Sequence, residues 1–172
     1  MKNLFFILIT LLTLSSTSCK KWQHKYPEDT ERSKDTPFER LTNKWWTLKS
    51  ASINGIDYTD SVKELFGIYQ IYFSQNLEQT TVGGLDFYLG TVKPEKESAF
   101  VSIWSFPDEA SVSIGPFFGF SGLKNVNLVP CYLNNNFTVW SYTILKLNES
   151  EFKIRITTKD QDTTITNYFK TN

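Results

Sequence analysis

Three stretches in the last third of the chain alternate between apolar and polar residues, with short polar segments between them. They are residues 138–147, 151–157 and 163–169. A period of two predicts β-strands with one face in a core and the other in water, so that Phe152 and Ile154 would face inward and Lys153 outward. Because the connections are too short for crossovers, these strands are expected to form an antiparallel meander.

The same alternation recurs through the middle of the chain. The predicted strands there are residues 46–50, 69–73, 79–82, 85–89, 98–106 and 111–114. Gln75-Asn76 is interpreted as a turn, and Gly83-Gly84 as the turn of a hairpin. About eight to nine strands without βαβ alternation predict an all-β fold, an antiparallel up-and-down β-barrel. A β-sandwich is the alternative, although sandwiches usually need long Greek-key connections.

One short helix is expected near the start of the barrel. Thr59 or Asp60 would cap it, it would run through residues 61–66, and Gly67 would end it. Val62, Leu65 and Phe66 would share one face of this helix. We expect it to act as a lid over one end of the β-structure.

The adjacent residues Trp45 and Trp46 stand at the mouth of the first predicted strand and supply a large rigid plug. The interior of a barrel of about eight strands is either filled by side chains or holds one small ligand. The candidate ligand-binding residues are Trp46, Leu48, Phe73, Phe87, Trp104 and Tyr142. Each of them is also explained as plain core. The Gly- and Phe-rich residues 117–136 are interpreted either as a binding loop or as a flap that fills the barrel mouth.

Residues 1–18 have the pattern of a secretory signal peptide: Lys2, then an apolar run over residues 4–12, then small residues. That run is too short to span a bilayer comfortably. Residues 16–19, Ser-Thr-Ser-Cys, resemble the lipobox of bacterial lipoproteins, which implies that Cys19 is acylated and becomes the first residue. An ordinary signal peptide with an incidental cysteine is the alternative. Lys20 resembles the residue that follows the cysteine in outer-membrane lipoproteins.

Residues 19–40 are polar and contain prolines, which predicts a lipidated flexible tether, with the barrel domain over residues 41–172. The sole histidine, His24, lies in this tether and is interpreted as solvated. If Cys19 carries lipid, Cys131 is left as a lone thiol, interpreted as a small buried hydrophobe and not as a nucleophile.

The composition argues against several classes of function. Basic and acidic side chains both number 18, so no net charge favours nucleic-acid binding. A catalytic triad lacks a base, and a metal site lacks His and Cys clusters, so no cofactor is expected. Paired carboxylates among Asp86, Asp108 and Glu109 are the remaining route to catalysis, and surface turns are the ordinary place for such residues. We therefore expect no enzyme.

The whole chain from Cys19 onward resembles the small lipocalin-like lipoproteins of Gram-negative bacteria. The residues that carry this resemblance are the first strand around Trp45-Trp46, the delayed short helix and the terminal meander. The resemblance implies an eight-stranded calyx. In the family's Gly-x-Trp motif Asn43 would take the place of the glycine, and Arg155 is the candidate for the basic residue that pairs with the tryptophan.

Two functions remain open. The first is an outer-membrane-anchored lipoprotein that binds a small hydrophobic ligand in the barrel. The second is a non-catalytic interaction or accessory lipoprotein with a side-chain-filled barrel and an envelope protein as partner. In both, the N-terminal lipid attaches the protein to the membrane.

Overall fold

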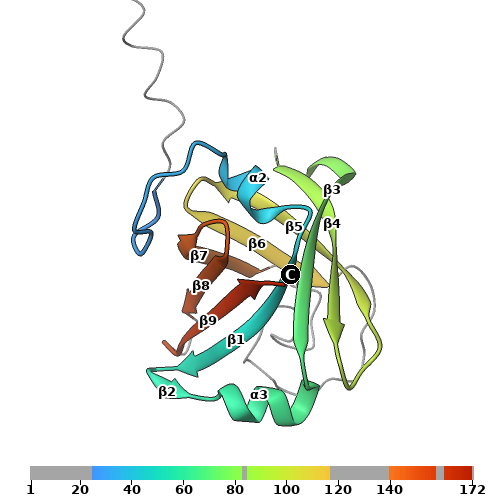
Figure 1. Cartoon of the computed structure of the whole chain (residues 1–172). Helices are drawn as coiled ribbons and strands as arrows, with labels where there is room; N and C mark the ends of the chain where they lie inside the picture. The colour runs from blue at the N-terminus through green and yellow to red at the C-terminus, as the bar shows by residue number, and fades with distance from the viewer. Residues whose placement is uncertain (1–24, 83–84, 117–139, 158–160, 172) are drawn as a thin grey trace, which may run out of the picture.

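The computed structural model describes residues 25–82, 85–116, 140–157 and 161–171. These residues form two short helices and nine strands (Figure 1). In chain order they are α2 (Pro37–Leu41), β1 (Trp45–Ile53), β2 (Ile56–Asp57), α3 (Thr59–Phe66), β3 (Tyr69–Val82), β4 (Leu85–Pro94), β5 (Phe100–Asp108), β6 (Ser111–Pro116), β7 (Trp140–Leu147), β8 (Glu151–Thr157) and β9 (Thr163–Lys170). The signal peptide, Cys19, His24, Cys131 and residues 117–136 lie outside the described residues.

The strands form one closed antiparallel barrel. Each strand from β3 to β9 pairs with the next, and β1 pairs with both β3 and β9, which closes a ring of eight strands. β2 is an additional short strand that pairs with β1 alone. The predicted up-and-down barrel is confirmed, and the sandwich alternative is wrong. Closure leaves no long free sheet edge, which is how barrels avoid pairing with other chains.

The predicted turn at Gln75-Asn76 is wrong. β3 continues through it as one strand of fourteen residues, which also includes the predicted strand at residues 79–82. The ladder with β4 shifts register between Phe73 and Leu77, so the polar residues mark an irregularity in the pairing. Such bulges bend a strand and increase its twist without ending it. The hairpin to β4 is confirmed, since Val82 lies opposite Leu85.

The two ends of the barrel differ in their packing. We call the end where β1 and β8 begin the α2 end, and the end where they finish the α3 end (Figure 1). Large buried aromatic side chains gather at the α2 end: Trp46, Phe73, Trp104, Phe152 and Tyr168. At the α3 end the buried side chains of the strands are mostly smaller and include Ala51, Ile156, Thr164 and Thr166.

The helix α3 covers the α3 end and confirms the predicted element with two differences, in its exposed face and in its cap. Val62 and Phe66 are buried, but Leu65 is 49% exposed. Successive helical residues are turned by 100° about the axis, so Val62 and Phe66 lie close together on the buried face and Leu65 lies at its edge. The predicted cap at Thr59 or Asp60 is wrong, because both lie inside the helix and the N-cap residue is Tyr58, whose side chain makes no capping hydrogen bond. Asp57, just before it, accepts a hydrogen bond from the Thr59 N–H at 2.8 Å. Gly67 ends the helix as expected, with φ of 67°.

The packed part of the chain begins before Leu41. Residues 25–36, which we call the strap, lie against the barrel and lead into α2, and Tyr26, Asp29 and Arg40 are all at most 4% exposed. Thr36 and Glu39 form a capping box at the start of α2. Tyr26, Asp29 and Arg40 are thus packed into the fold and not part of a solvated tether, whereas most other polar side chains of the strap are exposed.

Candidate functional site

The candidate ligand-binding residues whose side chains the structure describes lie in different parts of the barrel. Trp46, Phe73 and Trp104 are fully buried at the α2 end, and Tyr142 is 3% exposed near the start of β7. Leu48 is half-buried on β1. Phe87 lies on β4, and its side chain is outside the described residues.

The buried aromatic residues of the α2 end contact one another in a continuous cluster. Ring centroids are separated by 5.6 Å between Trp46 and Phe152, 5.8 Å between Phe152 and Phe73, and 5.4 Å between Phe73 and Trp104. Tyr88 stacks on Trp104 at 4.9 Å. Each such aromatic pair contributes about 0.5–1.5 kcal/mol beyond its buried area.

Both indole N–H groups of this cluster are also satisfied by the protein. The Trp46 Nε1–H donates to the Leu41 carbonyl at 2.9 Å, and the Trp104 Nε1–H donates to the Leu89 carbonyl at 2.9 Å. No donor of these two rings is left for a ligand. Trp46, Phe73 and Trp104 are therefore core residues, and this half of the barrel is filled by side chains.

Sequence reasoning missed two adjoining open grooves on the outside of the barrel near α3. The first has a volume of about 410 Å³ and is lined by Thr47, Leu48, Lys63, Gly67, Ile68 and Glu95. The second, of about 370 Å³, shares Ile68 and Glu95 with the first. Ile68 is 54% exposed between them, and its N–H donates to Glu95 Oε2 at 2.9 Å. The grooves escape sequence analysis because their residues come from three separate segments.

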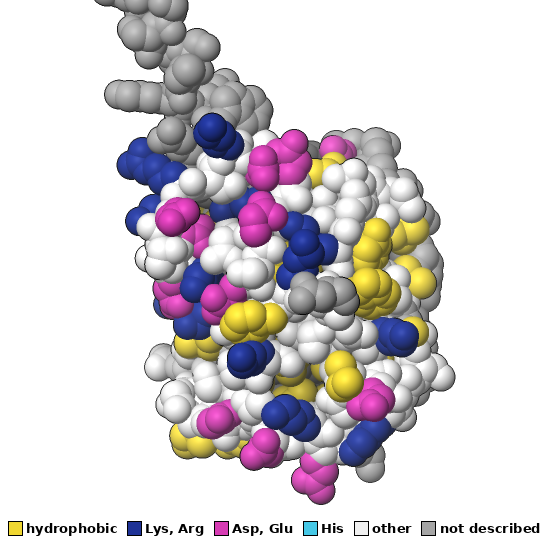
Figure 2. Space-filling view, in the orientation of Figure 1, with side chains coloured by type: hydrophobic (Ala, Val, Ile, Leu, Met, Phe, Trp, Pro, Cys, Tyr) yellow, Lys and Arg dark blue, Asp and Glu magenta, His cyan; other side chains and the backbone are white. Residues whose placement is uncertain are grey.

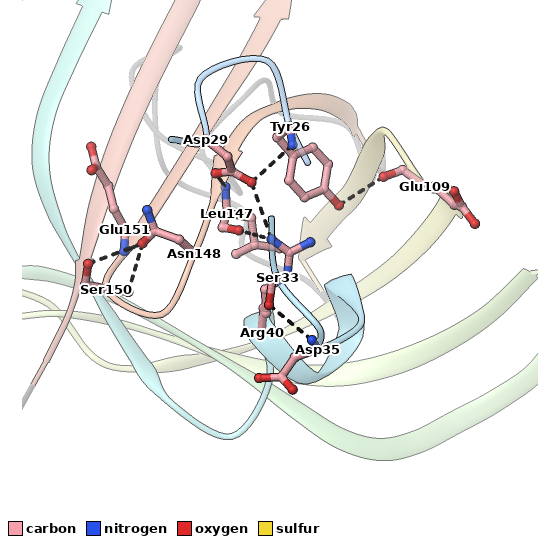
Figure 3. Close-up of polar contacts among 10 residues, drawn as sticks. All are labelled: Tyr26, Asp29, Ser33, Asp35, Arg40, Glu109, Leu147, Asn148, Ser150 and Glu151. Carbon is pink, nitrogen blue, oxygen red and sulfur yellow. Dashed lines mark hydrogen bonds and ion pairs between the residues drawn. The ribbon is translucent and has the colours of Figure 1, made fainter. Parts of the chain in front are cut away.

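A buried ion pair fastens the strap to the barrel (Figure 3). Asp29 Oδ2 lies 3.4 Å from Arg40 Nη1, and both side chains are 1% exposed. Asp29 also accepts hydrogen bonds from the N–H of Tyr26 at 3.1 Å and of Leu147 at 3.0 Å. Arg40 Nη1 donates to the Leu147 carbonyl. The pair thus joins the strap, α2 and the end of β7 in one network.

Tyr26 covers this ion pair. The Arg40 guanidinium lies 5.3 Å from the centre of the Tyr26 ring, a cation–π contact, and the Tyr26 hydroxyl donates to the Glu109 carbonyl at 3.0 Å. Burial raises the pKa of the Tyr26 phenol well above its ordinary value. Tyr26 is therefore neutral at physiological pH and serves as a packing and hydrogen-bonding group.

Arg155 does not pair with the barrel tryptophan. Its side chain is exposed on β8, on the opposite face from the buried Phe152, Ile154 and Ile156. The cation beside Trp46 is Lys44, whose Nζ lies 5.7 Å from the ring centre. The buried guanidinium at this end comes from Arg40 on α2.

The carboxylates considered for catalysis do not gather at a mouth. Asp86 is exposed on β4. Asp108 accepts hydrogen bonds from the Ala110 N–H at 2.8 Å and the Ser111 hydroxyl at 2.9 Å, which stabilises the β5–β6 turn. Within the described ranges, no group of three or more His, Cys, Asp or Glu side chains is placed to hold a metal ion.

Neither helix described in the structure has the length and apolarity needed to cross a bilayer. The described surface mixes both signs of charge, as Figure 2 shows for one face. Comparison of the chain with protein-family models, with curated proteins and with solved structures finds no match.

Proposed function

We propose that this protein is an outer-membrane-anchored lipoprotein, lipocalin-like in architecture, that acts as a non-catalytic interaction module. The observation that carries the proposal is the aromatic cluster of the α2 end. Three of the six candidate ligand-binding residues belong to it and are fully buried against other rings. A barrel filled in this way at one end offers a rigid outer surface there, and the lipid raises the local concentration of a partner on the same membrane.

The anchor is tested first. Metabolic labelling with a palmitate analogue should mark the wild-type protein and not a Cys19→Ala variant, and only the wild type should sediment with the outer membrane. An unlabelled wild-type protein, or a Cys19→Ala variant that keeps its membrane association, would contradict the lipoprotein proposal.

The interaction role is tested by photo-crosslinking in intact cells of the native organism. A photoreactive residue in place of Ile68, between the two grooves, should recover one dominant protein partner. The same residue in place of Arg155, exposed on the outer face of β8, is the matched control. A diffuse background from both positions would argue against a specific partner.

A small hydrophobic ligand is the second candidate, confined to the α3 end. It is favoured by the smaller buried side chains there, among them Ala51, Thr164 and Thr166. Of the original candidates, Tyr142 alone lies among the buried residues outside the aromatic cluster. After the purified protein is incubated with a lipid extract, native mass spectrometry should then detect one small molecule bound to it. No retained molecule would count against this role.

A further inference from the structure

The strap hydrogen-bonds the end of β7, a short stretch that β6 does not reach. β6 pairs with β7 only from Trp140 to Thr143, so the last residues of β7 extend past it. The strap takes that place: the Glu28 N–H donates to the Leu145 carbonyl at 2.9 Å, and Asp29 accepts from the Leu147 N–H. Backbone groups of a buried strand need such partners. The strap is therefore a bound part of the fold.

This binding shortens the chain between the barrel and Cys19. A tether over residues 19–40 would reach about 75 Å when fully extended, whereas the six steps from Cys19 to Lys25 reach about 20 Å. The strap begins at the α2 end, where Tyr26 donates to Glu109 at the β5–β6 turn, and Figure 1 shows α3 at the opposite end of the barrel. A nine-residue strand such as β1 is about 30 Å long. The anchor point therefore lies within about 20 Å of the start of the strap and cannot reach the far end of the barrel, whatever path the six residues take.

We propose that the lipid surface holding the anchor lies beside the α2 end and the strap, so that the α3 end with its two grooves points away from the membrane. The inference depends on the proposed acylation of Cys19. It adds an orientation, and it assigns the lipid surface to one face and protein partners to the other.

The charge of the strap indicates what sets this orientation. The strap and α2 together, residues 25–41, contain four basic and five acidic side chains, a difference of one negative charge. Anionic lipid attracts basic segments by about 1 kcal/mol per Lys or Arg, and this segment has no basic excess. The short chain therefore fixes the orientation, which should be the same on neutral and on anionic vesicles.

The test uses the full-length acylated protein in phosphatidylcholine vesicles that carry a short-range quencher on some headgroups. A fluorophore is attached through p-azidophenylalanine in place of Glu31 on the strap or Glu64 on α3, both exposed, so that neither cysteine is disturbed. The probe on the strap should be quenched severalfold more than the probe on α3. The ratio should not change when anionic lipid is added.

A Gly/Ser insertion of eighteen residues between His24 and Lys25 is the matched variant, because it lengthens the chain without touching the described fold. It should bring the two probes close to equal quenching. Equal quenching in the wild-type protein, with Cys19 acylated by mass spectrometry, would overturn the orientation and leave the anchor intact. An unacylated Cys19 would overturn the proposed anchor and the orientation together.

Discussion

The same eight strands build both ends of the barrel, but the two ends are packed by different side chains. The α2 end is filled by contacting aromatic rings, with Trp46 and Trp104 hydrogen-bonded to backbone carbonyls. The α3 end combines aliphatic side chains and buried threonines with Tyr69, Tyr142 and the apolar face of a helix, whose Phe66 ring lies 5.7 Å from that of Tyr69. The α2 end is a core of contacting aromatic rings, and the α3 end contains fewer of them. Substitutions at the two ends should therefore lower the free energy of unfolding by different amounts.

The largest effect is expected at the α2 end. Trp104→Ala removes a ring that contacts Phe73 and Tyr88, and core Trp→Ala changes cost roughly 3–5 kcal/mol. Urea unfolding measures this loss. Val101→Ala on the same strand, at a position that is 46% exposed, is the control and should change stability by less than about 0.5 kcal/mol. Similar small losses for both would show that the α2 end is not a packed core.

The ion pair of the strap should give the next largest effect. Asp29→Ala leaves the Arg40 charge buried without its partner, which costs about 3 kcal/mol. The same unfolding measurement applies, and the exposed Glu31→Ala on the strap should be nearly neutral.

The double variant Asp29→Leu/Arg40→Met sharpens this result. Replacing both charges with apolar side chains also removes the Arg40 Nε and Nη2 groups, which have no hydrogen-bond partner among the described residues. It should recover the part of the loss that comes from the unpaired Arg40 charge, but not the part that comes from the Tyr26 and Leu147 N–H groups, which lose their acceptor. A double variant as unstable as Asp29→Ala would assign the whole loss to these N–H groups.

At the α3 end, Gly67→Ala should cost roughly 2 kcal/mol, because the position has φ of 67° and ψ of −134°. A methyl group there would also clash with the Glu95 carboxylate. Adding Glu95→Ala relieves that contact but not the backbone strain, so thermal unfolding should show partial recovery. Full recovery would assign the whole cost to the contact.

A smaller effect is expected from the covering helix. Val62→Ala removes two buried methyl groups, at about 0.8 kcal/mol each, and should cost about 1.5 kcal/mol. Leu65→Ala in the same helix should cost much less, since Leu65 is 49% exposed. Equal losses in urea unfolding would mean that the two faces of α3 are not distinct.

The smallest effect concerns pH. The Thr36 N–H and then the Thr36 hydroxyl hydrogen-bond Glu39 and hold its pKa below its ordinary value of 4.5. A lowered pKa in the folded state stabilises α2 above pH 4.5, and this contribution is lost as the pH falls through the lower folded value. The protection of the α2 amides against hydrogen exchange, measured relative to the intrinsic exchange rate at each pH, should therefore decrease below pH 4.5 in the wild type. In Glu39→Gln this pH dependence should be absent.

The sequence predicted those parts of the structure that depend on local pattern. On β8 the apolar residues alternate with polar ones, and the structure confirms that Phe152, Ile154 and Ile156 face the core. Gln75-Asn76 misled because a polar pair is typical of turns as well as of bulges, and only the pairing with β4 separates the two.

The strap was missed for a different reason. Its polar composition is that of a solvated linker, and Asp29 and Arg40 are buried only because β7, more than a hundred residues later in the chain, supplies Leu147 as their partner. The buried candidates Trp46, Phe73 and Trp104 illustrate the same dependence on distant segments. Alternation identifies inward-facing aromatic residues, but whether they line a space or fill it is decided by neighbours from other strands.

The seam between β1 and β9 bears on how the protein is made. β1 pairs with β9 over seven positions but with β3 over three, and Trp46 lies opposite Lys170. Contacts between the first and last strands form slowly, because the whole intervening chain must be ordered before the ends meet. Until the last strand has folded, the edge of β1 that pairs with β9 therefore has no hydrogen-bond partner.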